Sequence, residues 1–318
     1  MFLLIRGGEL KRRAEGPVVA RLPCQTGFTI TEVLVSVGLV SVLMSLMLPA
    51  VQQARSASRS MQCRNNLHQL GIAAHNVHTQ FGFLVTTNPC RRLLAPLGEM
   101  PTSALLDDFD KTYASGGIVD GTRMSTPSVL ICTSDEGADA RAHDLSYAVN
   151  TGATIGRDSG IRTRSGRIRF SDVTDGLSNS AFLAEKLVYL EEFGKRSVTE
   201  GRQRPLRYSW RTLREFGTGQ EDELASHCLS SETRAISEQG SWTGNKLYFN
   251  GSEPIYNHLV PPNNWSFGTN GDYEGPISPT GNHAGAVNIL LLDGSVQSTS
   301  ADCDTQVFRA IGTINQGD

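Results

Sequence analysis

The sequence has little excess charge and lacks the short motifs of the common enzyme classes. Its 318 residues carry a formal net charge of −3, so bulk electrostatic attraction to nucleic acid is not expected. The chain has no GxSxG elbow, HExxH helix, P-loop or glycine-rich dinucleotide turn. Its acidic residues and histidines are not spaced as a nucleophile, a base and an orienting group. These absences predict a protein that is not an enzyme.

Cysteines are also not arranged in a metal-binding pattern. There is no CxxC pair and no paired Cys/His spacing, so the spacing gives a zinc site little support. Scattered disulfides are expected instead if the domain lies outside the cytoplasm, and the sequence leaves their connectivity open. The six cysteines are Cys24, Cys63, Cys90, Cys132, Cys228 and Cys303.

One hydrophobic run, Phe28 to Val51, is long enough to cross a membrane. At about 1.5 Å per residue, a helix of this length spans the roughly 30 Å hydrocarbon core. The basic side chains of residues 1–27 outnumber the acidic ones, which holds that flank in the cytoplasm. We therefore predict a single-pass inner-membrane protein with a cytoplasmic N-terminus and a C-terminal domain in the periplasm or at the cell surface.

Glu32 is the anomaly in this run, because a carboxylate inside a membrane helix costs about 2.5 to 3.5 kcal/mol on insertion scales. A secretory signal has a shorter apolar region, and Leu48 stands where its cleavage site requires a small residue. A plain anchor gains nothing from the acid. A third interpretation supplies a partner. Cleavage between Gly27 and Phe28 would create a terminal amine one helical turn before Glu32, and the amine of a neighbouring copy could neutralise the acid.

These residues resemble the type IV prepilin motif, which the pseudopilins of type II secretion share. The matching features are a basic leader, Gly27, Phe28, Glu32 and an apolar helix that contains Pro49. The resemblance implies that prepilin peptidase cleaves after Gly27 and N-methylates Phe28. It also implies that Glu32 supports assembly with other pilin-like subunits or with further copies of the chain. Pro49 is expected to kink or locally unwind the helix near its outer end.

A second helical pattern follows the apolar run. Apolar residues recur mostly at spacings of three and four from Ala50 to Phe81, which predicts an amphipathic helix continuous with the membrane segment. His75 and His78 form an i, i+3 pair near His68, and two histidines at this spacing could bind one metal ion. No nearby cysteine or acidic cluster completes a ligand set, so we interpret these histidines as exposed polar positions.

Beyond residue 81 the pattern changes to short strand-like runs separated by turn residues. The runs span residues 127–134, 145–152, 166–173 and 180–190, the last being ambiguous between strand and helix. Near the end, Asp293-Gly294 separates two β-rich runs and favours a type I′ hairpin turn. A short helix is predicted over residues 304–313, with Asp304 as its N-cap. The predicted class is α+β, with an antiparallel sheet packed on the long helix.

Residues 194–214 interleave arginines with Tyr208 and Trp210. This composition could contact nucleic acid. A solvated insertion is favoured, because the overall charge is negative and no recognised nucleic-acid module surrounds the stretch. No nucleic-acid partner is expected.

Five separated pieces of sequence resemble one bacterial family of prepilin-type proteins, the domain of unknown function 1559. They are MQCRNNLHQLGIAAHN, LICTSDEG, LSYAVNTG, SDVTDGLSNSAFLAEK and NHAGAVNILLLDGSVQSTS, in this order over nearly the whole chain. Two departures are CTSD, in which Thr133 stands where a proline usually follows the cysteine, and Ala286 where a second glycine is common. The C-terminal signature consists of His283, Gly285, Asn288, Asp293, Gly294 and Ser295, for which we predict structural roles.

The family resemblance implies a pilin-like protein without transferable catalytic residues. Cys63 and Cys132 both lie in segments that resemble the family. We therefore hypothesise that they form a disulfide, which would stabilise the domain by about 2 to 4 kcal/mol. The predicted domains are a cytoplasmic leader (1–27), a transmembrane helix (28–51), an amphipathic helix (52–81) and an extracytoplasmic α+β domain (82–318) with a C-terminal β-hairpin.

No cofactor is expected. The alternative hypothesis is that the domain binds calcium. Asp172 and Asp175 lie in SDVTDGLSNS, and Asp272 and Glu274 lie in GTNGDYEG, where their oxygens could bind calcium. Turn formation explains both stretches equally well.

The sequence thus predicts a membrane-anchored structural subunit of a pilus-like or type II secretion-associated assembly. The alternative is a processed membrane protein that never polymerises and has a ligand-binding or envelope-structural domain.

Overall fold

The computed structural model describes two compact units, Met1–Gln52 and Gln53–Asp318, here called the first and second units. The described residues are 28–86, 89–94, 96–98, 118–119, 122–123, 126–140, 144–155, 159–162, 166–188, 205–207, 209–211, 214, 216–236, 238–239, 254–268 and 275–316.

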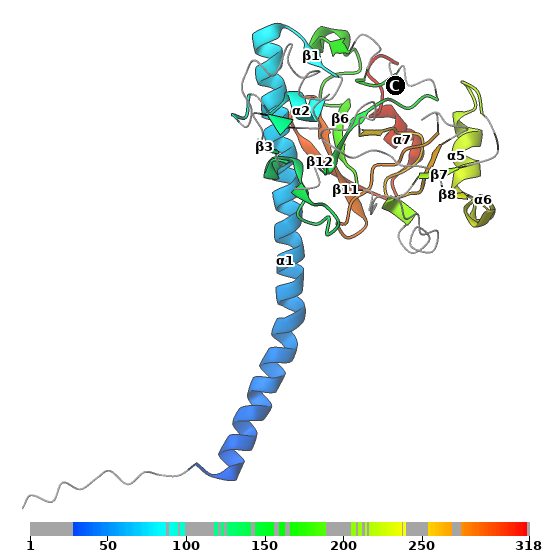
Figure 1. Ribbon diagram of the computed structural model, residues 1–318. Coiled ribbons are helices and arrows are strands. Elements are labelled where there is room, and N and C mark those ends of the chain that lie inside the picture. The colour runs from blue at the N-terminus through cyan, green and yellow to red at the C-terminus, as the bar shows by residue number, and fades with distance from the viewer. Residues whose placement is uncertain are drawn as a thin grey trace, which may run out of the picture. The chain divides into compact units, whose positions relative to one another are not determined.

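Helix α1 runs from Ile30 to Phe81 and belongs to both units (Figure 1): residues 30–52, here called its first half, lie in the first unit, and residues 53–81, its second half, lie in the second. In the first unit its side chains are exposed, whereas in the second unit one face is buried. The helix ends at Gly82, whose φ of 73° places it in the left-handed region. Its amide donates to the His78 carbonyl oxygen at 2.8 Å, a common way for a glycine to end a helix.

A five-stranded sheet forms the centre of the second unit. Its order is β12-β11-β6-β4-β9, with antiparallel pairing except between β4 and β9, which run parallel. The strands are β4 (Tyr147–Asn150), β6 (Ala181–Glu185), β9 (Ile255–Tyr256), β11 (Ala286–Leu291) and β12 (Val296–Ser300). The long helix and this sheet confirm the predicted α+β class, although the sheet is mixed rather than purely antiparallel.

The main core joins α1 to this sheet. Every residue of β4 and β6 is buried, as expected for strands covered on both faces. Leu67 and Leu70 of α1 and Phe308 of helix α7 (Thr305–Ala310) belong to the same apolar cluster as Leu183 of β6. The second half of α1 and the closing helix are therefore integral to the second unit.

A smaller apolar cluster lies around a three-stranded sheet of order β10-β7-β8. Trp210 is fully buried, and its ring stacks on Trp265 with centroids 4.5 Å apart. Helices α5 and α6 lie beside β7 and β8 (Figure 1). The elements here are β7 (Ser209–Arg211), β8 (Glu238–Gln239), β10 (Ser266–Gly268), α5 (Glu221–Leu229) and α6 (Ser231–Ile236).

Short elements complete the described part of the chain. They are β1 (Leu84–Val85), α2 (Pro89–Arg92), β2 (Ile118–Val119), β3 (Thr122–Arg123), β5 (Arg167–Ile168) and the 3₁₀ helices η2 (Ser128–Leu130), η4 (Phe170–Asp172) and η5 (Pro205–Arg207). Strand β1 pairs with β5, and β2 pairs with β3, both antiparallel.

Two expected strands are shorter or absent. Residues 127–134 form η2 and a turn rather than a strand. Here the amide of Asn66 on α1 donates to the carbonyl oxygens of Ser128 at 3.4 Å and Ile131 at 3.1 Å, so bonds to a helix side chain replace a strand partner. The 166–173 run contains only the two-residue β5, followed by η4.

The C-terminal hairpin is present, but its turn differs from the expected type. Gly294 has a φ of 88°, whereas Asp293 has no positive φ, and a type I′ turn requires positive φ at both residues. The Gly294 amide donates to the Leu291 carbonyl oxygen at 3.0 Å, which gives a three-residue loop that ends in a left-handed glycine. Asp293 Oδ1 accepts from the Ser295 amide at 2.8 Å and hydroxyl at 2.7 Å, and these bonds favour the longer loop.

The closing helix is α7, and Asp304 is its N-cap, as predicted. The Asp304 carboxylate accepts from the Gln306 amide at 2.8 Å and the Val307 amide at 3.1 Å. These bonds satisfy two of the amides that the first turn of a helix leaves without partners.

Candidate functional site

The candidate site is a buried polar cluster around Glu185, the last residue of β6. Glu185 is only 1% exposed and lies opposite Tyr147 of β4 in the sheet. Its side chain is held within the protein because β6 is a central strand between β4 and β11. A buried carboxylate is costly unless hydrogen-bond donors surround it, so its partners define the site.

Asn288 and His283 supply these donors. Glu185 Oε2 accepts from the backbone amide of Asn288 at 2.9 Å, and Oε1 accepts from the Asn288 side-chain amide at 2.9 Å. His283 Nε2 lies 3.0 Å from Oε1. Asn288 is itself oriented by Ser298, its cross-strand neighbour, whose hydroxyl donates to Asn288 Oδ1 at 2.5 Å. The predicted structural roles of His283 and Asn288 thus correspond to direct bonds to one buried acid.

A tight turn positions His283. The Ala286 amide donates to the His283 carbonyl oxygen at 2.7 Å, and the two residues between them have positive φ, 36° at Ala284 and 82° at Gly285. Positive φ at both central positions is the type I′ pattern, so the turn expected at Asp293-Gly294 occurs here instead. Gly285 adopts this conformation readily, whereas Ala284 does so at a cost of about 1 kcal/mol.

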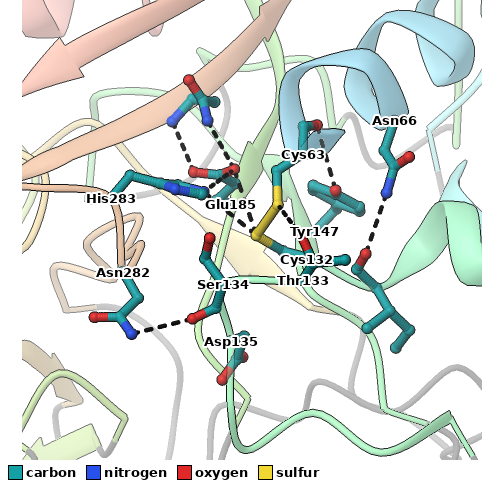
Figure 2. The surroundings of a disulfide bond; sticks show 12 residues. Cys63, Asn66, Cys132, Thr133, Ser134, Asp135, Tyr147, Glu185, Asn282 and His283 are labelled. Atoms are coloured by element: carbon teal, nitrogen blue, oxygen red, sulfur yellow. Dashed lines mark hydrogen bonds and ion pairs between the residues drawn. A yellow bond between two sulfur atoms is a disulfide. The ribbon is translucent and has the colours of Figure 1, made fainter. Parts of the chain in front are cut away.

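A disulfide lies next to this acid–histidine pair. Cys63 of α1 and Cys132, which follows η2, are bonded with their Cα atoms 5.1 Å apart. These are the two cysteines that the family resemblance paired. Figure 2 shows Glu185 and His283 on the Cys132 side of the bond. Cys132 Sγ lies 3.3 Å from His283 Nε2 and 3.8 Å from Glu185 Oε1.

The spacing of cysteines and histidines in the sequence gave no indication of this arrangement. Ligand atoms of Cys63, Cys132, Glu185 and His283 all lie within 4.8 Å of one another, and all four residues are buried. They come from α1, the η2 loop, β6 and the turn before β11. In the described part of the chain, no other group of three or more such side chains meets the same distance limit. The sequence shows only a Glu at the end of one apolar run and a His before another, and neither reveals that the two side chains meet.

The hairpin loop, which contains the signature residue Gly294, is bonded to two histidines of α1. His68 Nδ1 lies 2.9 Å from the Gly294 carbonyl oxygen, and His75 Nε2 lies 2.9 Å from the Leu292 carbonyl oxygen. Between these histidines, a Cβ on Gly71 would lie 3.1 Å from Gly294 Cα. His68 is exposed, as expected, although it bonds to the hairpin. His75 is half-buried, so its interpretation as an exposed polar position is wrong.

His78 is also engaged, because its ring stacks on Phe170 with centroids 3.8 Å apart. The Phe170 amide donates to His78 Nε2 at 3.2 Å. Burial lowers the pKa of His78, and the neighbouring His75 lowers it further. A neutral ring is needed for this nitrogen to accept, so the pKa shift and the hydrogen bond agree.

Three further charged side chains, Asp135, Lys186 and Arg207, are also buried. Arg207 and Asp135 form a buried ion pair at 2.6 Å, and the second Asp135 oxygen accepts from the Val188 amide at 2.7 Å. Lys186 Nζ donates to the Ser278 carbonyl oxygen at 2.7 Å and the Ser266 hydroxyl at 3.0 Å. Complete burial lowers the pKa of Lys186 to about 7. These bonds join loops to β6 and offer no exposed reactive group.

The described calcium candidates make bonds within the chain. Asp172 Oδ2 accepts from the Arg169 amide at 2.9 Å. Asp175 Oδ2 accepts from the Thr313 hydroxyl at 3.0 Å and the Gln316 amide at 3.1 Å. Asp272 and Glu274 lie outside the described residues, and the calcium hypothesis stays a prediction.

The first unit contains the residues expected to act in processing and assembly. Phe28 is 87% exposed, and Gly27 lies outside the described residues. Glu32 Oε2 accepts from the backbone amide and the hydroxyl of Thr29, each at 2.9 Å, while the Glu32 amide donates to Thr29 Oγ1 at 3.3 Å. This reciprocal pair is a capping box, and the spacing of Thr29 and Glu32 in the sequence is the signal that could have indicated it.

Pro49 lies inside α1, and the residues on both sides of it are helical. The expected local unwinding at Pro49 is therefore absent, and the alternative expectation of a kink stays a prediction. Helix α1 includes a stretch long and apolar enough to cross a membrane, and none of that stretch is buried within the protein.

Comparisons with known proteins identify the second unit by family. No curated protein and no solved structure matches the chain. One family model, described as a protein of unknown function (DUF1559), matches residues 52–84 and 103–306. The match includes all four residues of the buried cluster and begins after the apolar part of α1. Because it covers well over half of the sequence, the chain belongs to the DUF1559 family.

Proposed function

We propose that the protein is a membrane-anchored, pilin-like structural subunit that acts by assembly rather than by catalysis. Prepilin peptidase cleaves after Gly27 and N-methylates Phe28, and the mature chain stays in the inner membrane with the second unit in the periplasm or at the cell surface. The observation that carries this proposal is the first half of α1. Its large apolar side chains are exposed, for example Leu34 at 66% and Leu46 at 68%, and need an apolar environment from outside the chain.

Glu32 has a specific role in this proposal. In the single chain its carboxylate caps its own helix through Thr29. During assembly the carboxylate exchanges these neutral donors for the methylated amine of Phe28 in a neighbouring copy. The carboxylate accepts charge-assisted bonds in both states, but only the amine brings an opposite charge, and this neutralisation removes most of the cost of a charge in the bilayer. Assembly is thereby restricted to the register in which amine and acid meet.

The test uses Glu32→Ala and Thr29→Val in full-length protein expressed in its own membrane. Association is measured in two ways. Neighbouring copies are cross-linked by a reagent that does not react with cysteine, and assemblies are recovered after shearing. We expect Glu32→Ala to abolish assembly while the protein remains in the membrane. Thr29→Val removes the hydroxyl of the capping box but keeps the acid, so assembly should persist. Equal loss in both variants would mean that Glu32 acts only as a cap, and normal assembly of Glu32→Ala would refute the proposal.

A second candidate function is a processed membrane protein that does not polymerise and binds a ligand through the second unit. A cleft of about 700 Å³ supports it, lined by residues that include Thr154, Glu221, Arg309 and Gln316. This candidate predicts that Glu32→Ala leaves function intact, whereas the structural-subunit proposal predicts its loss. Calcium remains a candidate ligand for this unit, and a chelator-sensitive rise in melting temperature would support it.

A further inference from the structure

We propose that Cys63, Cys132, His283 and Glu185 form a zinc site when the disulfide between the two cysteines is reduced. The proposal goes beyond assembly, which assigns the second unit no ligand. Four side chains that are separated in sequence converge in one buried place, and their ligand atoms lie within 4.8 Å of one another. The same cluster would then have two states, a disulfide beside a His–Glu pair, or a metal with four protein ligands.

The donor distances agree with the size of a zinc tetrahedron. With Zn–S near 2.3 Å and Zn–N and Zn–O near 2.0 to 2.1 Å, ligand atoms are separated by about 3.3 to 3.8 Å. The observed separations are 3.0 Å between His283 Nε2 and Glu185 Oε1, 3.3 Å between His283 Nε2 and Cys132 Sγ, and 3.8 Å between Cys132 Sγ and Glu185 Oε1. These three atoms therefore need to shift by only a few tenths of an ångström.

Only the distance between the two sulfur atoms has to change by more, and movement of Cys63 Sγ supplies most of that change. On reduction, Cys63 Sγ and Cys132 Sγ would separate to about 3.8 Å, which rotation of the side chains can supply while the Cα atoms stay near their 5.1 Å separation. Figure 2 shows Cys63 on the opposite side of Cys132 from Glu185 and His283, so Cys63 completes the ligand set from the helix.

Hydrogen bonds around the cluster already orient one of the proposed ligands, as they do in known metal sites. Ligating carboxylates are usually oriented by further hydrogen bonds, and Glu185 already accepts two from Asn288. Asn288 is in turn held by Ser298. These donors also disperse the net negative charge that two thiolates and one carboxylate leave around a divalent ion.

Ligand chemistry selects zinc over calcium. Thiolate and imidazole are preferred ligands of zinc, whereas calcium takes six to eight oxygens. The cluster offers one carboxylate, so calcium would have too few ligands. The four protein ligands also leave no open position, which indicates a structural rather than a catalytic metal.

The conversion of the disulfide state into the metal-bound state conserves electrons and protons. A dithiol reductant gives two electrons and two protons to the Cys63–Cys132 bond, yielding two thiols and a disulfide of the reductant. Zn²⁺ then displaces the two thiol protons and binds the neutral imidazole and the carboxylate. Metal and disulfide therefore both join α1 to the η2 loop, and the metal would also bind Glu185 of β6 and hold the second unit together before its cysteines are oxidised.

The test uses Co²⁺ as a spectroscopic substitute for zinc, added to the full chain in detergent. One sample is reduced with a phosphine and freed of it, and the other stays oxidised. We expect one Co²⁺ per reduced chain, with thiolate-to-metal charge-transfer absorption and the visible bands of tetrahedral cobalt, and their loss on addition of Zn²⁺. The oxidised chain should show none of these signals.

Variants distinguish the folded site from binding by loose thiols. His283→Gln should weaken cobalt binding at least about tenfold, a loss seen even for outer ligand partners, whereas Cys303→Ser should leave it unchanged. Circular dichroism of the same samples reports folding. Absence of cobalt signals in the reduced chain, whether it is folded or unfolded, would overturn the proposal. Equal binding by wild type and His283→Gln would also overturn it.

Discussion

The two halves of α1 belong to one continuous helix but are stabilised in different ways. In the first half the apolar side chains are exposed, with Val42 at 59% and Leu43 at 55%, whereas Leu67 and Leu70 in the second half are completely buried. The second half is thus stabilised by the protein's own core, and the first half depends on surroundings that the chain does not provide. Continuous helical structure therefore does not indicate a common role.

Two glycines show the same contrast. A Cβ on Gly38 would meet nothing within 4 Å, whereas one on Gly71 would lie 3.0 Å from Leu290 Cδ1 and 3.1 Å from Gly294 Cα. Gly71 is needed where α1 approaches the hairpin backbone closely. In the first half, no described part of the chain lies close enough to Gly38 to require a residue without a side chain.

The largest expected difference comes from shortening one leucine in each half. Leu70→Ala should destabilise the second unit by about 2 to 5 kcal/mol, because it leaves a cavity in a close-packed core. Leu43→Ala should leave that unit's stability unchanged. Denaturant unfolding of the full chain in detergent, followed by the fluorescence of Trp210 and Trp265, measures both. Equal destabilisation would contradict the division of α1 into two differently stabilised halves.

Removal of the disulfide tests how the second half of α1 is held. Replacing Cys63 and Cys132 by serine should cost about 2 to 4 kcal/mol, since an unfolded chain without the cross-link gains conformational entropy. The loop that the bond closes is long, with a sequence separation of 69. Unfolding is compared with Cys303→Ser, in chelator so that metal does not contribute. A cost no larger than that of the control would mean that packing alone fixes the helix.

Adding bulk at the two glycines should have a smaller effect. Gly71→Val should destabilise the second unit by about 1 to 3 kcal/mol through overpacking, and the contacts of His68 and His75 with the hairpin should weaken. Gly38→Val should not affect that unit. The matched pair is compared by thermal unfolding and by amide exchange in the hairpin. Unchanged protection in Gly71→Val would show that the hairpin moves aside freely.

A pH series distinguishes the halves by their titratable groups. Burial lowers the pKa of His258 from 6.5 to about 3, although its bond to the Phe308 carbonyl oxygen opposes the shift. Between these values the unfolded state binds the proton and the folded state does not. Stability of the second unit should therefore fall as pH falls from 6.5 towards 3, by at most about 1.4 kcal/mol per pH unit from this group.

The control for this series is His258→Gln, whose stability should show a shallower slope in the same range, whatever its absolute value. Carboxylates titrate in both proteins and cancel in the difference. The first half of α1 should keep its helix content throughout, because Glu32 is its only titratable side chain. Identical slopes for His258→Gln and the wild type would show that His258 does not contribute to the pH dependence of stability.

Much of the architecture could be predicted from local patterns. The apolar run, the amphipathic continuation, the strand at 147–150 and the capped closing helix each follow from periodicity or capping residues within a short window. The 127–134 run was misjudged because bonds from Asn66 on α1 decide its conformation. The hairpin turn was misjudged because Asp293 bonds to Ser295 rather than adopting a positive φ.

The candidate site was less predictable than the fold. Glu185 was not singled out, because a lone acid at the end of an apolar run gives no sign of its burial. His283 and Asn288 were assigned structural roles without an identified partner. The sequence does not indicate the cluster proposed as a zinc site, because metal-binding motifs require local spacing, whereas Cys63 and His283 meet only through α1 and the sheet. The family resemblance supplied the cysteine pair, which physical reasoning on the sequence had left open.

Mass spectrometry of the N-terminus of the mature protein from membranes tests the central claim most directly. The account predicts a chain that begins with N-methylated Phe28, produced by cleavage after Gly27. An intact leader, or a chain that begins beyond Pro49, would contradict it. In either case the first half of α1 would be only an anchor or a secretory signal, and Glu32 would have no amine of a neighbouring copy to meet.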